Sequence, residues 1–248
     1  MDSRLYFTIT LVVLAWLSAS TCNATNHTNG TNVTTTAAAP TPTLIASTTV
    51  APALVYNDTV SALEANLTND GCGTVRLCAG QPSDCNPANS ACTLLGAKAK
   101  GGNVFEFLLA GESEGYLGAV VSFDAALGGN DTTYICFNDN GQIKFTGASL
   151  ENNVLTRKTV NANNVRGKIT GKKMQCIFDA TVDSSTARAA RAPDAALGVV
   201  SGTYNSSSGS FGAPTTLIKT DPINLSNPNQ TVTNNAATTA SPDVTMTT

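Results

Sequence analysis

Residues 104–123, with the sequence VFEFLLAGESEGYLGAVVSF, decide the fold of this chain. Apolar residues alternate in the first half, so one face of a predicted strand carries Phe105, Phe107 and Leu109. A glycine-containing turn occupies residues 111–115, and a second apolar segment runs from 116 to 123. Two strand-like segments around a short turn predict an antiparallel β-hairpin.

Further strand signals follow along the chain. Residues 132–137 form an apolar segment, and Asn140-Gly141 is a tight-turn signal from which residues 142–145 pair back. A strand at 173–182 alternates again, with one side made of Met174, Cys176, Phe178, Ala180 and Val182. A last strand is predicted at 197–204. Short strands separated by turns predict an all-β fold, an immunoglobulin-like antiparallel β-sandwich.

Six cysteines lie within the same region. They are Cys72, Cys78, Cys85, Cys92, Cys136 and Cys176. A zinc site is the alternative to disulfides, but the spacings lack the C-x-x-C pairs of common zinc modules. We expect two bridges within the first four cysteines and one from Cys136 to Cys176, which would staple the sandwich.

The N-terminus has the features of a signal peptide, assigned to residues 1–22. A positive charge at Arg4 precedes an apolar run at 5–17 and then small residues. Cleavage after Ser20 would leave Cys22 in the mature chain, whereas cleavage after Cys22 would leave an even cysteine set. No later segment is apolar enough to span a membrane, so we expect a secreted, extracellular protein.

Two polar segments flank the predicted sandwich, which we place at 70–222. Residues 23–69 and 223–248 are rich in Thr, Asn, Ala and Pro, and we expect both to be disordered. Asn-x-Ser/Thr sequons predict N-glycosylation at ten positions. They are Asn23, Asn26, Asn29, Asn32, Asn57, Asn66, Asn130, Asn205, Asn224 and Asn229.

The charge distribution argues against nucleic acid as a partner. The formal net charge is −3, and the basic residues between 157 and 173 are balanced by acidic residues elsewhere in the folded region. A solvated strand edge is the expected role of this basic cluster. A contact for anionic glycans or lipids is the alternative.

Residues that could support catalysis are sparse. The one histidine, His27, lies in the glycan-rich segment, so the predicted sandwich has no Ser-His-Asp arrangement. Glu112 and Glu114 are interpreted as solvated turn carboxylates. A calcium site is a minor alternative for the loop aspartates Asp124, Asp131 and Asp139. Sugar stacking is a minor alternative for Tyr116 and Tyr134, whose expected role is core packing. We expect no metal site and no enzyme.

Three blocks of sequence in a fixed order carry a resemblance to a known family. The blocks are CGTVRLCAGQPSDC at 72–85, FEFLLAG followed by GY at 105–116, and GND followed by YIC at 129–136. In this order they resemble the DOMON domain of the animal ferric-chelate reductase family, from Cys72 to Val182 and onward to about Ser226. The resemblance implies a β-sandwich that precedes a cytochrome b561 membrane part in longer relatives.

The resemblance also implies where haem b would be ligated. A methionine is expected just before the Gly-Asn-Asp block, where this chain has Gly128, and a histidine near Gly147. Glycine has no side chain to ligate iron. Met174 is interpreted as core packing. We therefore expect no cofactor.

Three hypotheses on function follow. The first is a secreted, non-enzymatic DOMON-domain protein that has lost the haem ligands and binds an extracellular carbohydrate or protein. The second is a haem-binding redox domain related to ferric-chelate reductase, which would make it an oxidoreductase. The third is a glycan-coated structural or mucosal protein in which the sandwich carries the glycosylated segments.

Overall fold

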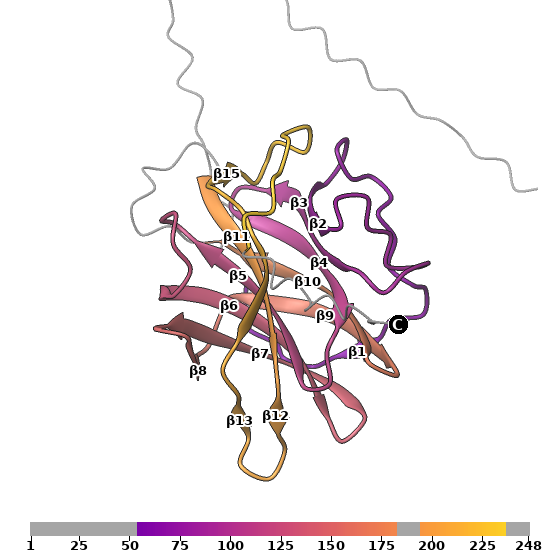
Figure 1. The fold of residues 1–248 in the computed structure, drawn as a ribbon, viewed down its shortest axis with the longest axis vertical. Helices are drawn as coiled ribbons and strands as arrows, with labels where there is room; N and C mark the ends of the chain where they lie inside the picture. The colour runs from indigo at the N-terminus through magenta and orange to yellow at the C-terminus, as the bar shows by residue number, and fades with distance from the viewer. Residues whose placement is uncertain (1–53, 183–193, 237–248) are drawn as a thin grey trace, which may run out of the picture. The chain divides into compact units, whose positions relative to one another are not determined.

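The computed structural model describes residues 54–182 and 194–236. Within these residues the chain contains no helix, and fifteen strands form three sheets (Figure 1). The all-β fold expected from the sequence is confirmed. The predicted signal peptide, His27 and the sequons at Asn23, Asn26, Asn29 and Asn32 lie outside the described residues.

One layer of the sandwich is a six-stranded sheet. Its strands are antiparallel, apart from a short parallel pairing of the edge strand β1 with β9. In spatial order they are β1 (Ser61–Ala62), β9 (Ala162–Thr170), β10 (Lys173–Thr181), β4 (Val104–Glu112), β3 (Thr93–Gly101) and β2 (Leu77–Gln81).

The other layer is a seven-stranded antiparallel sheet. Its path runs β14 (Thr215–Lys219), β11 (Asp194–Gly202), β5 (Tyr116–Ser122), β6 (Gly129–Asp139), β7 (Gln142–Glu151) and β8 (Val154–Arg157), and β15 (Ile223–Asn224) also pairs with β11. The hairpin predicted at Asn140-Gly141 is confirmed, because β6 and β7 pair across this turn. Both turn residues have positive φ, 53° and 86°, as a tight hairpin turn requires.

The predicted hairpin of 104–109 with 116–123 is wrong. β4 pairs with β3 and β10 in one sheet, whereas β5 pairs with β6 and β11 in the other. The turn between them is therefore a corner that carries the chain across the sandwich. Gly115 occupies this corner, where a Cβ atom would collide with the backbone at Gly202 and Tyr204.

The hydrophobic core fills the space between the two sheets. The alternation predicted for β4 and β10 is confirmed, because Phe105, Phe107, Leu109, Met174 and Phe178 are at most 1% exposed. Aromatic rings stack through the centre, with the Phe107 ring centroid 5.8 Å from that of Tyr134 and 5.5 Å from that of Phe178. Such close ring pairs contribute beyond their buried area.

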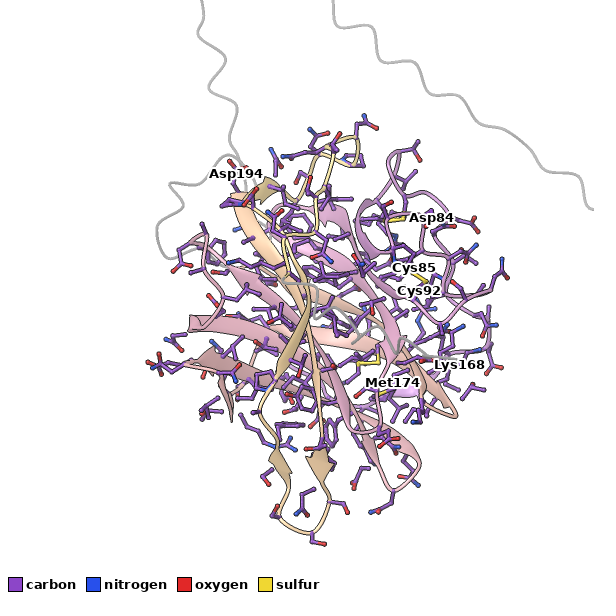
Figure 2. All side chains as sticks on the ribbon, in the orientation of Figure 1. Asp84, Cys85, Cys92, Lys168, Met174 and Asp194 are labelled. Carbon is purple, nitrogen blue, oxygen red and sulfur yellow. A yellow bond between two sulfur atoms is a disulfide. The ribbon has the colours of Figure 1, made fainter. Side chains whose placement is uncertain are left out.

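Three disulfides are present among the described residues. Cys136 of β6 and Cys176 of β10 link the two sheets through the core, and both are 1% exposed. Cys72–Cys78 and Cys85–Cys92 close short loops next to β2 and β3. Figure 2 shows the Cys85–Cys92 bridge in these loops and Met174 among the strands.

The cysteine-rich segment covers part of the outer face of the six-stranded sheet. A small hydrophobic cluster forms there, made of Leu63, Leu67, Cys78, Cys85, Cys92, Leu94, Leu108, Ala110 and Ile177. Gln175 ties the covering segment to the sheet, because its Oε1 accepts a hydrogen bond from Leu67 N at 3.1 Å.

A hairpin covers part of the outer face of the seven-stranded sheet. It is formed by β12 (Tyr204–Asn205) and β13 (Ser210–Phe211), which pair with each other. Its two aromatic rings pack on Tyr116 and Phe137, and the Arg157 guanidinium lies 4.6 Å from the Phe211 ring centroid. The hairpin is thus held by aromatic and cation–π contacts.

The flanks predicted to be disordered are partly folded. Residues 54–69 contain β1 and bury Leu67, and residues 223–236 contain β15 and bury Leu225. At the C-terminal side, Lys219 N donates to Asn234 Oδ1 and Asn235 N donates to Lys219 O. Their polar composition did not predict this order, because these segments attach through backbone hydrogen bonds and single buried leucines and do not have a regular apolar face.

Candidate functional site

A pocket opens at one end of the sandwich, which we call the end pocket. Its volume is about 180 Å³. It is lined by Val121, Phe123, Thr132, Tyr134, Lys158, Thr159, Val160, Asn161, Thr181 and Val182. These residues come from the end of β5, the start of β6, the β8–β9 connection and the end of β10, so both sheets contribute.

The end pocket combines an exposed aromatic ring with polar groups. Phe123 is 40% exposed at the end of β5. Lys158 is also exposed, and its Nζ donates to Thr132 Oγ1 at 3.2 Å. Deeper in the pocket Tyr134 is 2% exposed, and its hydroxyl donates to Thr181 O at 3.3 Å. Phe123 therefore offers an apolar face beside a rim of hydroxyl and ammonium groups.

The β8–β9 connection is positioned by a glycine in β7. Lys158 N donates to Gly147 O at 3.0 Å, and a Cβ atom on residue 147 would collide with Val160 and with the Lys158 carbonyl oxygen. The methyl groups of Val160 thus occupy the space that a side chain at 147 would need. This close approach brings Lys158, Thr159 and Val160 to the rim of the pocket.

Gly147, where the resemblance places a histidine ligand, therefore has no room for a side chain. Gly128, where the resemblance places a methionine ligand, precedes β6 and has a φ of +106°, a conformation that L-amino acids other than glycine rarely adopt. Its amide donates to Asp131 Oδ2 at 2.6 Å, so this turn needs both the glycine and the aspartate. Both glycines have structural roles, and neither position accommodates a ligating side chain without a change of backbone.

The residues around the end pocket do not fit haem. The lining contains no histidine, methionine or cysteine, which are the usual axial ligands. Met174 lies in the core at 1% exposure. A volume of about 180 Å³ is also smaller than the roughly 300–1,000 Å³ of typical cofactor and drug sites.

Of the two turn carboxylates, Glu114 has a cationic partner. Glu114 forms an exposed ion pair with Lys172 at 2.7 Å. The hydrogen bond from Lys172 holds the pKa of the Glu114 carboxyl below its ordinary value, and Glu114 in turn raises the pKa of the Lys172 ammonium. A fully ionised, solvated glutamate is a poor proton donor near neutral pH.

The three loop aspartates have separate structural roles. Asp131 binds the Gly128 amide, and Asp124 accepts hydrogen bonds from Ser122 Oγ and Ala126 N. Asp139 accepts one from Asn140 Nδ2. Within residues 54–182 and 194–236 no cluster of three or more potential metal ligands occurs. Tyr134 is buried in the core and Tyr116 beneath the β12–β13 hairpin, so neither offers an exposed face to a sugar.

Six predicted sequons fall in the described part of the chain. Five of the asparagines are exposed and Asn224 is partly buried; the exposed ones are Asn57, Asn66, Asn130, Asn205 and Asn229. Asn57 and Asn205 accept hydrogen bonds from backbone amides two residues ahead, in Asx turns. Glycosylation at these positions remains a prediction.

Sequence reasoning missed Phe123, Lys158 and Asn161 as pocket residues. Phe123 is the last residue of the apolar segment 116–123, which was predicted as a strand without a separate role for this residue. Lys158 belonged to the basic cluster between 157 and 173, and Asn161 to no motif, and only the close approach to Gly147 shows where their connection goes. The basic cluster was the one sequence signal that included a residue of this pocket.

Comparison with known proteins gives a distant, partial likeness. The chain is 28% identical over 170 residues to a Danio rerio protein named "Putative ferric-chelate reductase 1". The matched part covers 66% of this chain and 29% of that protein, so the chain corresponds to less than a third of its length. No family model and no solved structure matches the chain. Among the described residues no helix is long and apolar enough to cross a membrane.

The likeness and the disulfides support two coarse statements. The chain is related to a protein named as a ferric-chelate reductase. Its three disulfides are typical of proteins that fold in oxidising compartments outside the cytosol.

Proposed function

We propose that this chain is a secreted, N-glycosylated, DOMON-like domain that binds a sugar residue in the end pocket and catalyses no reaction. The observation that carries the proposal is the exposed ring of Phe123 beside the polar groups of Lys158, Thr132 and Asn161. The relationship to a reductase supports the DOMON assignment, while the donor set of the pocket argues against haem chemistry.

A sugar suits the chemistry of the pocket. One face of a pyranose ring is apolar C–H surface that packs on an aromatic side chain, and its edge carries hydroxyl groups. Lys158 donates hydrogen bonds, the threonine hydroxyls donate and accept, and the Asn161 amide can do both. The volume of about 180 Å³ is suited to one ring rather than a long chain. A terminal sugar of an extracellular glycan is therefore the proposed ligand.

The proposal is tested on the purified secreted protein after enzymatic removal of its own N-glycans. A glycan array identifies a ligand, and titration calorimetry measures its affinity for wild type, Phe123→Ala and Val154→Ala. Val154 is 58% exposed on β8 and serves as the matched control. We expect Phe123→Ala to weaken binding about tenfold, because stacking contributes roughly 1–1.5 kcal/mol. Equal affinity of both variants, or no array binding by wild type, contradicts the proposal.

A redox domain related to ferric-chelate reductase is the second candidate, favoured by the named relative. An absorption spectrum of protein reconstituted with haem separates the candidates. We expect the spectrum of free haem. A Soret band at stoichiometric intensity that shifts on reduction would support the redox candidate instead.

A further inference from the structure

A second cavity lies on the outer face of the six-stranded sheet and shares no lining residue with the end pocket. We call it the sheet-face groove, and its volume is about 280 Å³. Its lining residues are Ser61, Lys100, Glu106, Asn164, Arg166, Ile177, Phe178 and Asp179. They come from β1, β3, β4, β9 and β10.

The sheet register explains why charged side chains meet here. Asp179 of β10 pairs with Glu106 of β4, which in turn pairs with Lys98 of β3, so these three side chains share one face. In the neighbouring row Arg166 of β9 pairs with Ile177 of β10. The groove thus has a floor at Ile177, which is 9% exposed, and walls of charged groups.

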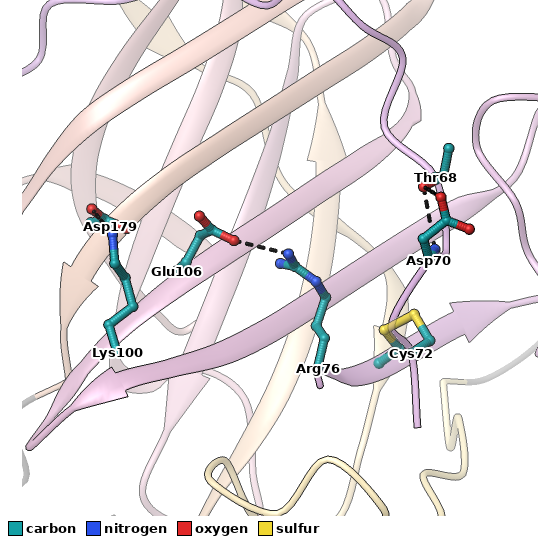
Figure 3. Close-up of polar contacts among 8 residues, drawn as sticks. Thr68, Asp70, Cys72, Arg76, Lys100, Glu106 and Asp179 are labelled. Atoms are coloured by element: carbon teal, nitrogen blue, oxygen red, sulfur yellow. Dashed lines mark hydrogen bonds and ion pairs between the residues drawn. A yellow bond between two sulfur atoms is a disulfide. The ribbon is translucent and has the colours of Figure 1, made fainter. Parts of the chain in front are cut away.

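Both carboxylates of the groove are neutralised internally. Glu106 Oε1 binds Arg76 Nη2 at 2.9 Å, and Asp179 Oδ2 binds Lys100 Nζ at 2.8 Å (Figure 3). Asp179 also accepts a hydrogen bond from Asn164 Nδ2 at 2.8 Å. Since Glu106 and Asp179 each have a cationic partner, they do not compensate a further positive charge.

Arg166 is that further charge. It is exposed, and its side chain makes no ion pair or hydrogen bond with any residue in 54–182 or 194–236. Arg76 adds no net charge here, because its guanidinium is paired with Glu106. Lys168, two residues along β9 from Arg166, adds an ammonium group that donates to Glu64 O. The groove is therefore locally cationic in a chain whose formal charge is −3.

We propose that the sheet-face groove binds an anionic extracellular polysaccharide, with Arg166 contacting a sulfate or carboxylate group. A guanidinium is suited to these planar or multidentate anions. Ser61 and Asn164 at the rim are suited to sugar hydroxyls. The volume lies below the roughly 300 Å³ of drug-sized sites, so one charged unit of a longer chain occupies it.

The composition of the groove favours a polysaccharide over a protein or a membrane. Its apolar residues, Ile177 and Phe178, are at most 9% exposed, so no exposed apolar anchor is available. Protein interfaces concentrate their binding energy in buried aromatic anchors. Membrane surfaces are bound by apolar insertion together with charge. The groove offers only charged and hydrogen-bonding groups, and these suit a hydrated, charged sugar chain.

The test uses the full secreted protein and two probes, heparin and hyaluronan hexasaccharides, with phosphatidylserine vesicles as the competing surface. The buffer contains about 150 mM NaCl, where surface charges beyond roughly 8 Å are screened. Wild type is compared with Arg166→Glu, Arg166→Lys and the charge-matched control Lys144→Glu. Lys144 is exposed on β7 in the other sheet. Thermal unfolding verifies that each variant is folded.

We expect wild type to bind at least one hexasaccharide. Arg166→Glu should weaken that binding about tenfold and Lys144→Glu less than twofold, because only the former reverses a charge at the site. Arg166→Lys should keep part of the affinity. Absence of binding to both probes, equal losses for Arg166→Glu and Lys144→Glu, or preferential binding to phosphatidylserine vesicles would overturn the proposal. The end pocket plays no part in this outcome, so a Phe123→Ala variant should bind the hexasaccharides like wild type.

Discussion

The Cys136–Cys176 disulfide should be the main covalent contributor to stability. It closes a loop with a sequence separation of 40 residues, against 6 for Cys72–Cys78 and 7 for Cys85–Cys92. In the chain-entropy treatment, a 40-residue loop stabilises the folded state by about 4 kcal/mol at 25 °C, and loops of 6 or 7 residues by about 2 kcal/mol. Removing both sulfur atoms from the core adds a packing loss, since both cysteines are 1% exposed.

The perturbation is the replacement of each cysteine pair by alanine, giving three double variants. Guanidinium chloride unfolding, followed by intrinsic fluorescence under non-reducing conditions, gives the free energy of unfolding of each. We expect a loss of about 4 kcal/mol or more for the Cys136/Cys176 variant and about 2 kcal/mol for each of the others. In thermal melts a loss of about 4 kcal/mol corresponds to a decrease in Tm of roughly 8–16 °C for a domain of this size.

The ranking of the three variants is the decisive result. If the Cys72/Cys78 variant loses as much stability as the Cys136/Cys176 variant, loop length does not govern the contribution of these bridges. The cysteine-rich segment would then be a cooperative part of the core rather than a covering on the sheet.

Three other predictions concern single side chains. Gly147→Ala should lower the free energy of unfolding by about 1–3 kcal/mol, because the new Cβ meets Val160 and the Lys158 carbonyl oxygen; an unchanged denaturation midpoint would contradict the packing at that position. Tyr116→Phe should cost about 1 kcal/mol, because its hydroxyl donates to Gly212 O at 3.0 Å. Burial raises the pKa of Tyr116 in the folded state, so its contribution is complete below the ordinary pKa of 10.0 and is lost as the pH rises above it. Ultraviolet titration should show at least one tyrosine fewer ionising in folded wild type than in unfolded protein, and the Tyr116→Phe variant should lack that difference of one; a full count in wild type would refute this. Arg157→Ala should cost about 0.5–1 kcal/mol and speed amide hydrogen exchange in residues 204–211, with Arg157→Lys intermediate, whereas unchanged exchange would show that the cation–π contacts do not hold the hairpin.

The sequence predicted the core strands because their side chains obey a simple period. Phe105, Phe107 and Leu109 alternate, and so do Cys176, Phe178 and Ala180, and all six face the core. β3 was missed since its second half, AKAKG, is polar on one side and small on the other. Without β3, the strand β4 had no visible partner on that side, and its nearest neighbour in sequence, β5, was assigned to it wrongly.

The candidate site was less predictable than the fold. Pocket residues such as Phe123 and Lys158 come together from segments far apart in sequence, and no local pattern records that proximity. Arg166 belonged to a basic cluster that was expected to be a solvated edge. Arg166 has no acidic partner among the described residues because Glu106 is paired with Arg76 and Asp179 with Lys100. The sequence alone does not show that these residues are neighbours across the sheet.

The residues that follow β14 have a consequence for self-association. The Lys219 amide and carbonyl, on β14 at the end of the seven-stranded sheet, are occupied by Asn234 and Asn235. An uncovered edge strand is a template on which a strand of another molecule can add. A chain shortened before residue 223 would leave those groups open, and such a chain should form dimers and larger β-linked aggregates at high concentration. We therefore expect the polar C-terminal run to hinder such pairing, because it occupies two of the backbone groups that a neighbour would need.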